Sequence, residues 1–112
     1  MSPRSRELTA SAAASVFAAL GDPTRLALLS RLCDGHAYSI AQLTEGTTLT
    51  RQGITKHLFI LAGAKIVTSR RVGRESRYAV RPDALSEASA YLEKASRQWD
   101  DAILRLRQHV EE

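Results

Sequence analysis

The chain has 112 residues, 44% hydrophobic and 25% charged, with a formal net charge of +4, and this length fits one domain, residues 1–112, around a modest core. A single cysteine, Cys33, excludes an internal disulfide framework and a closed cysteine-rich zinc site, and it fits a reducing compartment. No run approaches about 18 apolar residues and no apolar signal segment opens the chain, so we expect a cytoplasmic domain without a membrane partner.

Two helices are predicted in the first third of the chain. Residues 7–20 are rich in alanine, with apolar residues at helical spacing, and Gly21 ends this helix as a C-terminal glycine cap. Asp22 as N-cap and Pro23 at the first helical position begin the second helix. Its predicted apolar stripe, which makes Cys33 a small core residue, comprises Leu26, Leu28, Leu29, Leu32 and Cys33.

A helix-turn-helix is predicted at about residues 39–62. Ser39 caps a short helix at residues 40–44 that Gly46 terminates, and Thr50 caps the next one. That second helix turns inward the residues Ile54, Leu58 and Leu61. Its free side carries Arg51, Gln52, Thr55, Lys56 and Phe59. Small polar residues on the free side of the second helix are typical of a helix that meets the base edges of DNA.

A basic hairpin is predicted at about residues 66–80, directly after this motif. Residues 66–71 and 76–80 alternate like strands, and Gly73 in the turn between them supplies the positive φ. Tyr78 and Val80 share one face of the second strand. A single short hairpin is marginally stable alone, so we expect it to pack against the helices as a wing.

A long terminal helix is predicted at about residues 83–110. Leucine or tryptophan repeats every seven residues, and alanine or histidine follows each of them by three. Such a helix spans about 40 Å, more than the preceding 81 residues can cover, so we favour a homodimer over a helix folded back on its own domain. The predicted dimer interface comprises Leu8, Leu85, Leu92, Trp99, Ile103 and Leu106.

The basic residues are concentrated in the predicted recognition helix and wing. Residues 1–49 carry no net charge, residues 50–81 carry +7, and residues 82–112 carry −3. Thirteen of the sixteen basic residues are arginine, whose planar guanidinium suits bidentate contacts to phosphates and guanine edges. A solvated charged face explains most charge runs, but this concentration favours a polyanionic partner.

Three segments together resemble the ArsR-type winged-helix transcriptional regulators. They are A-L-G-D-P-T-R-L-A-L-L (residues 19–29), L-T-R-Q-G-I-T-K-H-L-F-I-L (residues 49–61) and R-R-V-G-R-E-S-R-Y (residues 70–78). The resemblance covers about residues 7–110 and implies a mainly α, winged helix-turn-helix fold with a small β-hairpin and a long C-terminal dimerisation helix. It also implies a homodimeric prokaryotic repressor of a near-palindromic operator, within a subgroup that lacks the metal motifs.

Double-stranded DNA is therefore the expected partner. The predicted contacts are Thr50, Arg51, Gln52, Thr55, Lys56, His57, Arg70, Arg71, Arg74 and Arg77. Phe59 departs from the resembled motif, which usually has a polar or basic residue there, and we expect it to pack under the wing.

Several alternatives stay open at this level. A metal- or redox-responsive sensor of the same family is disfavoured, because one cysteine and the terminal His109 and Glu112 do not make a tight site. We predict no metal, no cofactor and no catalytic residue, and we leave any effector unknown. A protein-interaction module that does not touch DNA predicts a neutral recognition face. A nonspecific architectural DNA-binding protein is harder to separate from a regulator.

Overall fold

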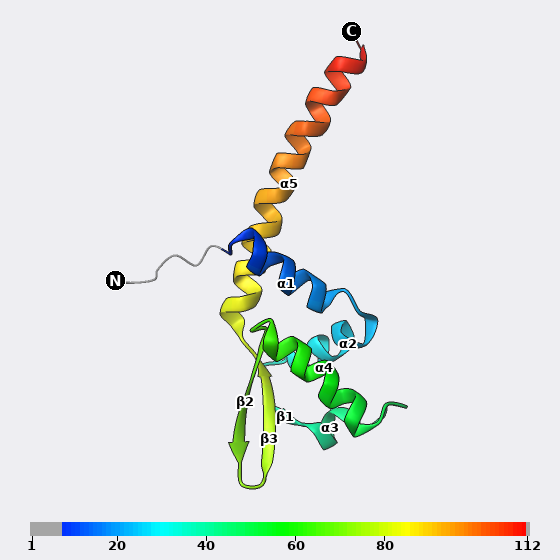
Figure 1. The fold of residues 1–112 in the computed structure, drawn as a ribbon, viewed down its shortest axis with the longest axis vertical. Coiled ribbons are helices and arrows are strands. Elements are labelled where there is room, and N and C mark those ends of the chain that lie inside the picture. The colour runs from blue at the N-terminus through cyan, green and yellow to red at the C-terminus, as the bar shows by residue number, and fades with distance from the viewer. Residues whose placement is uncertain (1–7, 112) are drawn as a thin grey trace, which may run out of the picture.

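The computed structural model describes residues 8–111, which form a helical body with a hairpin projecting from one end and a long helix rising from the other (Figure 1). The sheet is antiparallel, in the order β1-β3-β2. This arrangement confirms the predicted mainly α winged helix-turn-helix fold. The elements are α1 (Ala10–Leu20), α2 (Pro23–Leu32), β1 (Tyr38–Ser39), α3 (Ile40–Thr44), α4 (Arg51–Gly63), β2 (Val67–Val72), β3 (Glu75–Val80) and α5 (Pro82–Glu111).

Side-chain oxygens at the N-caps fix where four of the helices begin. Thr9, Asp22, Ser39 and Thr50 each accept a hydrogen bond from a backbone N–H in the first turn of the helix that follows. The first helix was predicted from Glu7, which lies outside the described residues; α1 begins at Ala10 because Thr9 caps it. Gly21 ends α1 with a φ of −82°, so it does so without the left-handed conformation that a glycine cap implies.

The core lies where α1, α2, α3 and α4 meet the base of the hairpin. Its largest fully buried side chains are Leu32, Leu43, Ile54, Leu58, Leu61 and Ile66. The predicted stripe of α2 was wrong at two positions, since Leu26 is 49% exposed and Cys33 is exposed. Leu28, Leu29 and Leu32 define the inward arc of α2, and at 100° per residue Arg25 falls within that arc while Leu26 falls outside it.

The sheet contains one strand that the sequence pattern did not predict. β1 is only two residues long and pairs with β3, Tyr38 opposite Tyr78 and Ser39 opposite Arg77. Ser39 therefore ends a strand and caps α3 at once, and its side chain is buried. In the hairpin, Gly73 has a φ of 66°, as predicted for the turn. β1 therefore connects the base of the wing to the helix-turn-helix.

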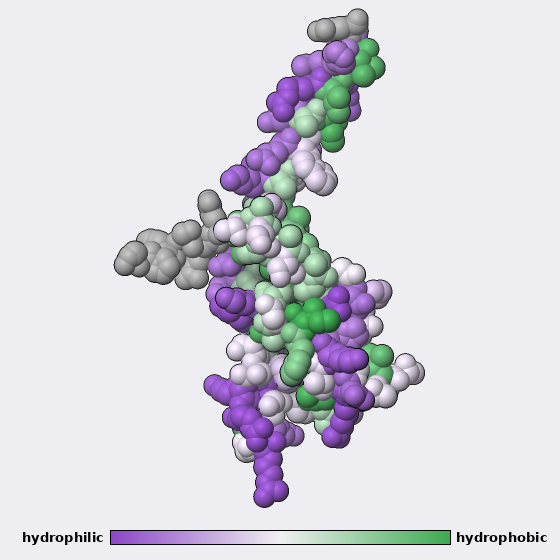
Figure 2. Space-filling model, in the orientation of Figure 1, coloured by the Kyte–Doolittle hydropathy of each residue, from purple (hydrophilic) through white to green (hydrophobic). Residues whose placement is uncertain are grey.

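Only the first part of α5 packs against the body. Ala88 is buried, Leu85 lies against the core, and the ring of Tyr91 lies 6.0 Å from that of Phe17. The helix has 30 residues, about 45 Å at 1.5 Å per residue, and its far part stands clear of the body with hydrophobic residues along one side (Figure 2). Among the described helices, α5 included, none is both long and apolar enough to cross a membrane.

The exposure of α2 predicts different costs for two leucines of the same helix. Leu32→Ala removes a fully buried side chain and should lower the free energy of unfolding by about 2–5 kcal/mol. Leu26→Ala removes a half-exposed one and should cost about 1 kcal/mol or less. Denaturant unfolding at a fixed protein concentration measures both, and equal losses would contradict the described orientation of α2.

Candidate nucleic-acid interface

The exposed side of α4 presents a polar and basic surface. Arg51, Gln52 and Lys56 are exposed and Thr55 is half-buried, while Ile54, Leu58 and Leu61 on the opposite side are fully buried. The N-terminal end of α4 and the tip of the hairpin lie toward the same end of the molecule, away from the far end of α5 (Figure 1). The fold therefore places the residues predicted on the free side of this helix at an accessible surface.

The first turn of α4 is held by its own side chains. The Thr50 hydroxyl accepts from the backbone N–H of Gly53 at 3.0 Å, and the Thr55 hydroxyl donates to the carbonyl of Arg51 at 2.8 Å. A Cβ at position 53 would lie 3.3 Å from Thr50 Oγ1, so the glycine leaves room for the cap. Thr50 thus orients the start of the helix, whatever further contacts its hydroxyl makes.

The hairpin carries arginine residues on both of its faces and at its tip. Arg70 lies opposite Arg77 in the antiparallel register and Arg71 lies opposite Ser76. Because neighbouring strand residues point to opposite faces, Arg70 and Arg77 share the outer face, while Arg71 lies on the face that carries Tyr78. Arg74 follows Gly73 at the tip. Hydrophilic side chains cover this projecting end (Figure 2).

Most of these cations have no acidic partner among the residues that the structure describes. Within residues 8–111, no ion pair engages the side chains of Arg51, Lys56, Arg70, Arg71 and Arg74. Arg77 differs, because its Nε donates to Glu75 Oε1 at 3.1 Å. Like charges held at one surface without counterions repel each other, so this surface favours an anionic ligand.

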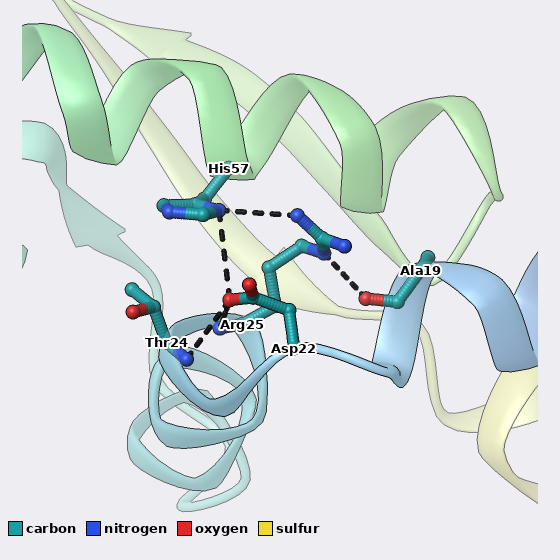
Figure 3. A network of polar contacts seen from close by, with 5 residues as sticks. All are labelled: Ala19, Asp22, Thr24, Arg25 and His57. Atoms are coloured by element: carbon teal, nitrogen blue, oxygen red, sulfur yellow. Dashed lines mark hydrogen bonds and ion pairs between the residues drawn. The ribbon is translucent and has the colours of Figure 1, made fainter.

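His57 points away from the exposed side of α4 (Figure 3). Its Nδ1 lies 3.2 Å from Nη1 of Arg25 and 4.0 Å from Oδ2 of Asp22. Arg25 also donates from Nε to the carbonyl of Ala19, and since a guanidinium only donates, the Arg25 contact needs an unprotonated Nδ1. His57 therefore ties α4 to the start of α2, and its predicted contact with DNA stays a prediction.

Asp22 lies at the centre of this network. Its Oδ2 accepts from the backbone N–H groups of Thr24 at 2.9 Å and Arg25 at 3.1 Å. The hydrogen bond from the Arg25 backbone, followed by the charge of the Arg25 guanidinium and the Thr24 N–H, holds the pKa of Asp22 below its ordinary value of 3.8. The ionised carboxylate is therefore the form that stabilises the α1–α2 corner.

Phe59 does not pack under the wing, contrary to the sequence-based expectation. Its side chain is 68% exposed and does not belong to the hydrophobic cluster of the core. The expectation rested on the resembled motif, which usually has a polar or basic residue at this position, but helical spacing places Phe59 with Gln52 and Lys56 on the outward side of α4.

The predicted dimer interface divides into two groups in the structure. Leu8 and Leu85 are half-buried and pack against the core of their own chain. The other four form an exposed stripe on α5, with exposures of 55% for Leu92, 71% for Trp99, 53% for Ile103 and 64% for Leu106.

The described residues contain no cluster of three or more histidine, cysteine, aspartate or glutamate side chains close enough to hold a metal ion. Cys33 is exposed, and His109 lies near the far end of α5. Glu112 lies outside the described residues.

The known proteins to which this chain is similar are transcriptional regulators. No protein-family model matches the chain. The chain is 39% identical over 82 residues to the HTH-type transcriptional regulator CmtR of Mycobacterium tuberculosis, a match that covers 73% of this chain and 69% of that relative. It is also 38% identical over 66 residues to the uncharacterized HTH-type transcriptional regulator YuzN of Bacillus subtilis, covering 54% of this chain and 72% of YuzN.

Solved structures extend this similarity to nearly the whole fold. An ArsR-like transcriptional regulator from Rhodococcus sp. RHA1 matches with a TM-score of 0.75 and 36% identity, over 88% of this chain and 92% of that one. A homodimeric winged helix-turn-helix DNA-binding domain from Mycobacterium bovis, a possible ArsR-family regulator, shares the fold with a TM-score of 0.64 at 20% identity, over 81% and 84% of the two chains.

The lowered pKa of Asp22 predicts a defined acid dependence of stability. A carboxylate with a depressed folded-state pKa stabilises the fold above its unfolded value, and this contribution is lost as the pH falls below 3.8 through the lower folded-state pKa. Asp22→Asn keeps an oxygen that can cap α2 but cannot ionise. The wild type should therefore be more stable than Asp22→Asn near neutral pH, and the difference should shrink in acid.

Denaturant unfolding from pH 7 to pH 2.5, at one protein concentration, measures this difference. Asp34→Asn is a comparison outside the network of His57: the pKa of Asp34 is also lowered, chiefly by its hydrogen bond from the Tyr38 hydroxyl, so this variant should show an acid dependence of its own. A difference between wild type and Asp22→Asn that stays constant with pH would contradict the assigned role.

Proposed function

Because the chain belongs to the ArsR family of winged helix-turn-helix transcriptional regulators, we propose that it is a homodimeric repressor that binds a near-palindromic operator sequence-specifically. The observation that carries the proposal is the set of cations on α4 and the wing that form no ion pair within residues 8–111. Duplex DNA carries about one charge per 1.7 Å, and cations that neutralise its phosphates release condensed counterions. A module that binds only protein is expected to have a neutral recognition face, whereas these residues form a basic one.

The residues of α4 supply the contacts that distinguish sequences. The guanidinium of Arg51 can donate two hydrogen bonds to one guanine, and the amide of Gln52 can pair with one adenine. Thr55 donates its hydroxyl to the Arg51 carbonyl, which leaves its methyl group for apolar contact. Lys56 is a flexible point charge suited to a phosphate. In this proposal, α4 lies in the major groove and the residues of its first turn contact base edges.

The arginines of the wing contribute affinity. Arg70, Arg71 and Arg74 project from a hairpin that β1 ties to the helix-turn-helix, so they reach the DNA backbone or a narrowed minor groove beside the segment that α4 reads. The Glu75 carboxylate on Arg77 makes Arg77 the weakest of the four contacts.

The apolar stripe of α5 supports the homodimer. On one side of α5 lie four side chains that the other described residues leave exposed: Leu92, Trp99, Ile103 and Leu106. A dimer joined along this stripe would present two copies of α4 and the wing to two half-sites of one duplex. A structural neighbour of the same fold is homodimeric.

Selection of bound duplexes from a random pool tests the proposed function directly. A repressor of this kind should enrich one near-palindromic sequence and bind it at least about a thousandfold more tightly than competitor DNA at physiological salt. Enrichment without any common sequence would identify a nonspecific architectural DNA-binding protein and reject the operator. Transcription from a promoter that carries the enriched sequence then distinguishes repression from activation.

Two substitutions on α4 should weaken binding in different ways. Arg51→Ala should lower operator affinity about 10- to 100-fold and relax the preference for one base pair. Lys56→Ala should weaken all sequences similarly and reduce the salt slope by about 0.9 for each phosphate that is no longer neutralised. Lys94→Ala removes the same charge from α5 and serves as the control. Mobility-shift titrations at several salt concentrations measure these effects, and unchanged binding by both α4 variants would remove the assignment.

Trp99, the single tryptophan of the chain, should report dimerisation. It is 71% exposed in one chain and should be covered in the dimer, because it lies in the middle of the stripe. Its fluorescence emission should therefore shift to the red on dilution to monomer, over the concentration range in which sedimentation shows dissociation. Constant emission across that range would place Trp99 outside the dimer interface.

A further inference from the structure

Phe59 is a large apolar side chain on the surface that the proposed function assigns to DNA. It is 68% exposed, and no core element covers it. Single exposed apolar residues are ordinary on protein surfaces, so exposure alone decides nothing. What distinguishes Phe59 is its place among residues whose chemistry suits a nucleic acid.

Helical geometry fixes that place. Gln52, Lys56 and Phe59 are spaced by four and three residues, so they lie on one side of α4, opposite the fully buried Ile54 and Leu58. Phe59 lies seven residues beyond Gln52, about 10 Å along the helix axis. For a helix that runs roughly along the duplex axis, that distance corresponds to about three base-pair steps of 3.4 Å. A helix that reads one base pair with Gln52 therefore carries Phe59 to a different base pair of the same half-site.

The chemistry of the neighbours limits what Phe59 can contact. Arg51 and Lys56 carry no ion pair in the described part of the chain, so this surface attracts an anionic partner and repels a basic one. A phenyl ring offers no hydrogen bond to a phosphate or to a polar base edge. In the major groove the apolar group that a protein meets is the C5-methyl of thymine, and phenylalanine is among the side chains that contact it.

We propose that Phe59 is a specificity-determining residue that packs against the methyl group of a thymine about three base pairs from the pair read by Gln52. This inference rests on the proposed function, because it requires that α4 enter the major groove. It assigns one position of the operator, in each half-site, to an apolar contact rather than to a hydrogen bond.

Replacement of thymine by uracil isolates the methyl group, because uracil keeps every hydrogen-bonding atom of the base pair. Each thymine of the selected operator is changed to deoxyuridine, one symmetric pair of positions at a time, and the affinity is measured for the wild type and for Phe59→Ala. At one position the wild type should lose about fourfold per half-site, which is the effect of removing one buried methyl group. Phe59→Ala should bind thymine and uracil operators equally at that position only.

Ile60→Ala is the matched control. Ile60 is a neighbouring apolar residue, 45% exposed, whose side chain points about 100° away around the helix. It should discriminate thymine from uracil as the wild type does. Circular dichroism and thermal unfolding confirm that both variants keep the fold, which the exposure of Phe59 favours.

The outcomes separate the two proposals. If the wild type binds every uracil-substituted operator as tightly as the thymine form, or if Phe59→Ala keeps the full discrimination, the assignment of Phe59 is wrong while the operator-binding function stands. If no duplex sequence is preferred at all, the proposed function fails, and the assignment of Phe59 fails with it.

Discussion

The burial of one side of α4 is the constraint on which the candidate interface depends. Ile54, Leu58 and Leu61 are fully covered by the surrounding helices and the base of the sheet, and this packing leaves no freedom in how α4 is rotated about its axis. The network of Asp22, Arg25 and His57 adds a polar contact beside the apolar one (Figure 3). Together they decide that Gln52, Lys56 and Phe59 face outward, so the identity of the exposed side follows from the core.

The elements with strong local signals were predictable from the sequence. The caps at Asp22, Ser39 and Thr50, the turn at Gly73 and the inward residues of α4 are all local patterns, and the structure shows each of them. The features that the sequence did not reveal depend on contacts between distant segments. β1 is two residues long and exists only because β3 lies beside it, and no periodicity can be read from two residues.

Contacts between distant segments also explain why the sequence-based predictions placed some side chains wrongly. Hydrophobicity alone put Leu26 and Cys33 in the core, whereas Arg25 occupies the inward arc of α2 because Ala19 and His57 satisfy its donors. The departure of Phe59 from the resembled motif led to its prediction under the wing, although helical spacing already placed it with Gln52. The contacts proposed for DNA and for a second copy of the chain involve molecules other than a single protomer, so neither the sequence nor the fold alone tests them.

The short distance between Thr50 Oγ1 and a Cβ added at position 53 affects how a protein of this kind could acquire a new target sequence. Any side chain at position 53 brings its Cβ within 3.3 Å of the capping oxygen, so a change there disturbs the start of α4 before it alters recognition. Position 57 is tied to the interior as well. Under the proposed function, changes of operator preference should therefore occur at positions 51, 52, 56 and 59, whose side chains are exposed.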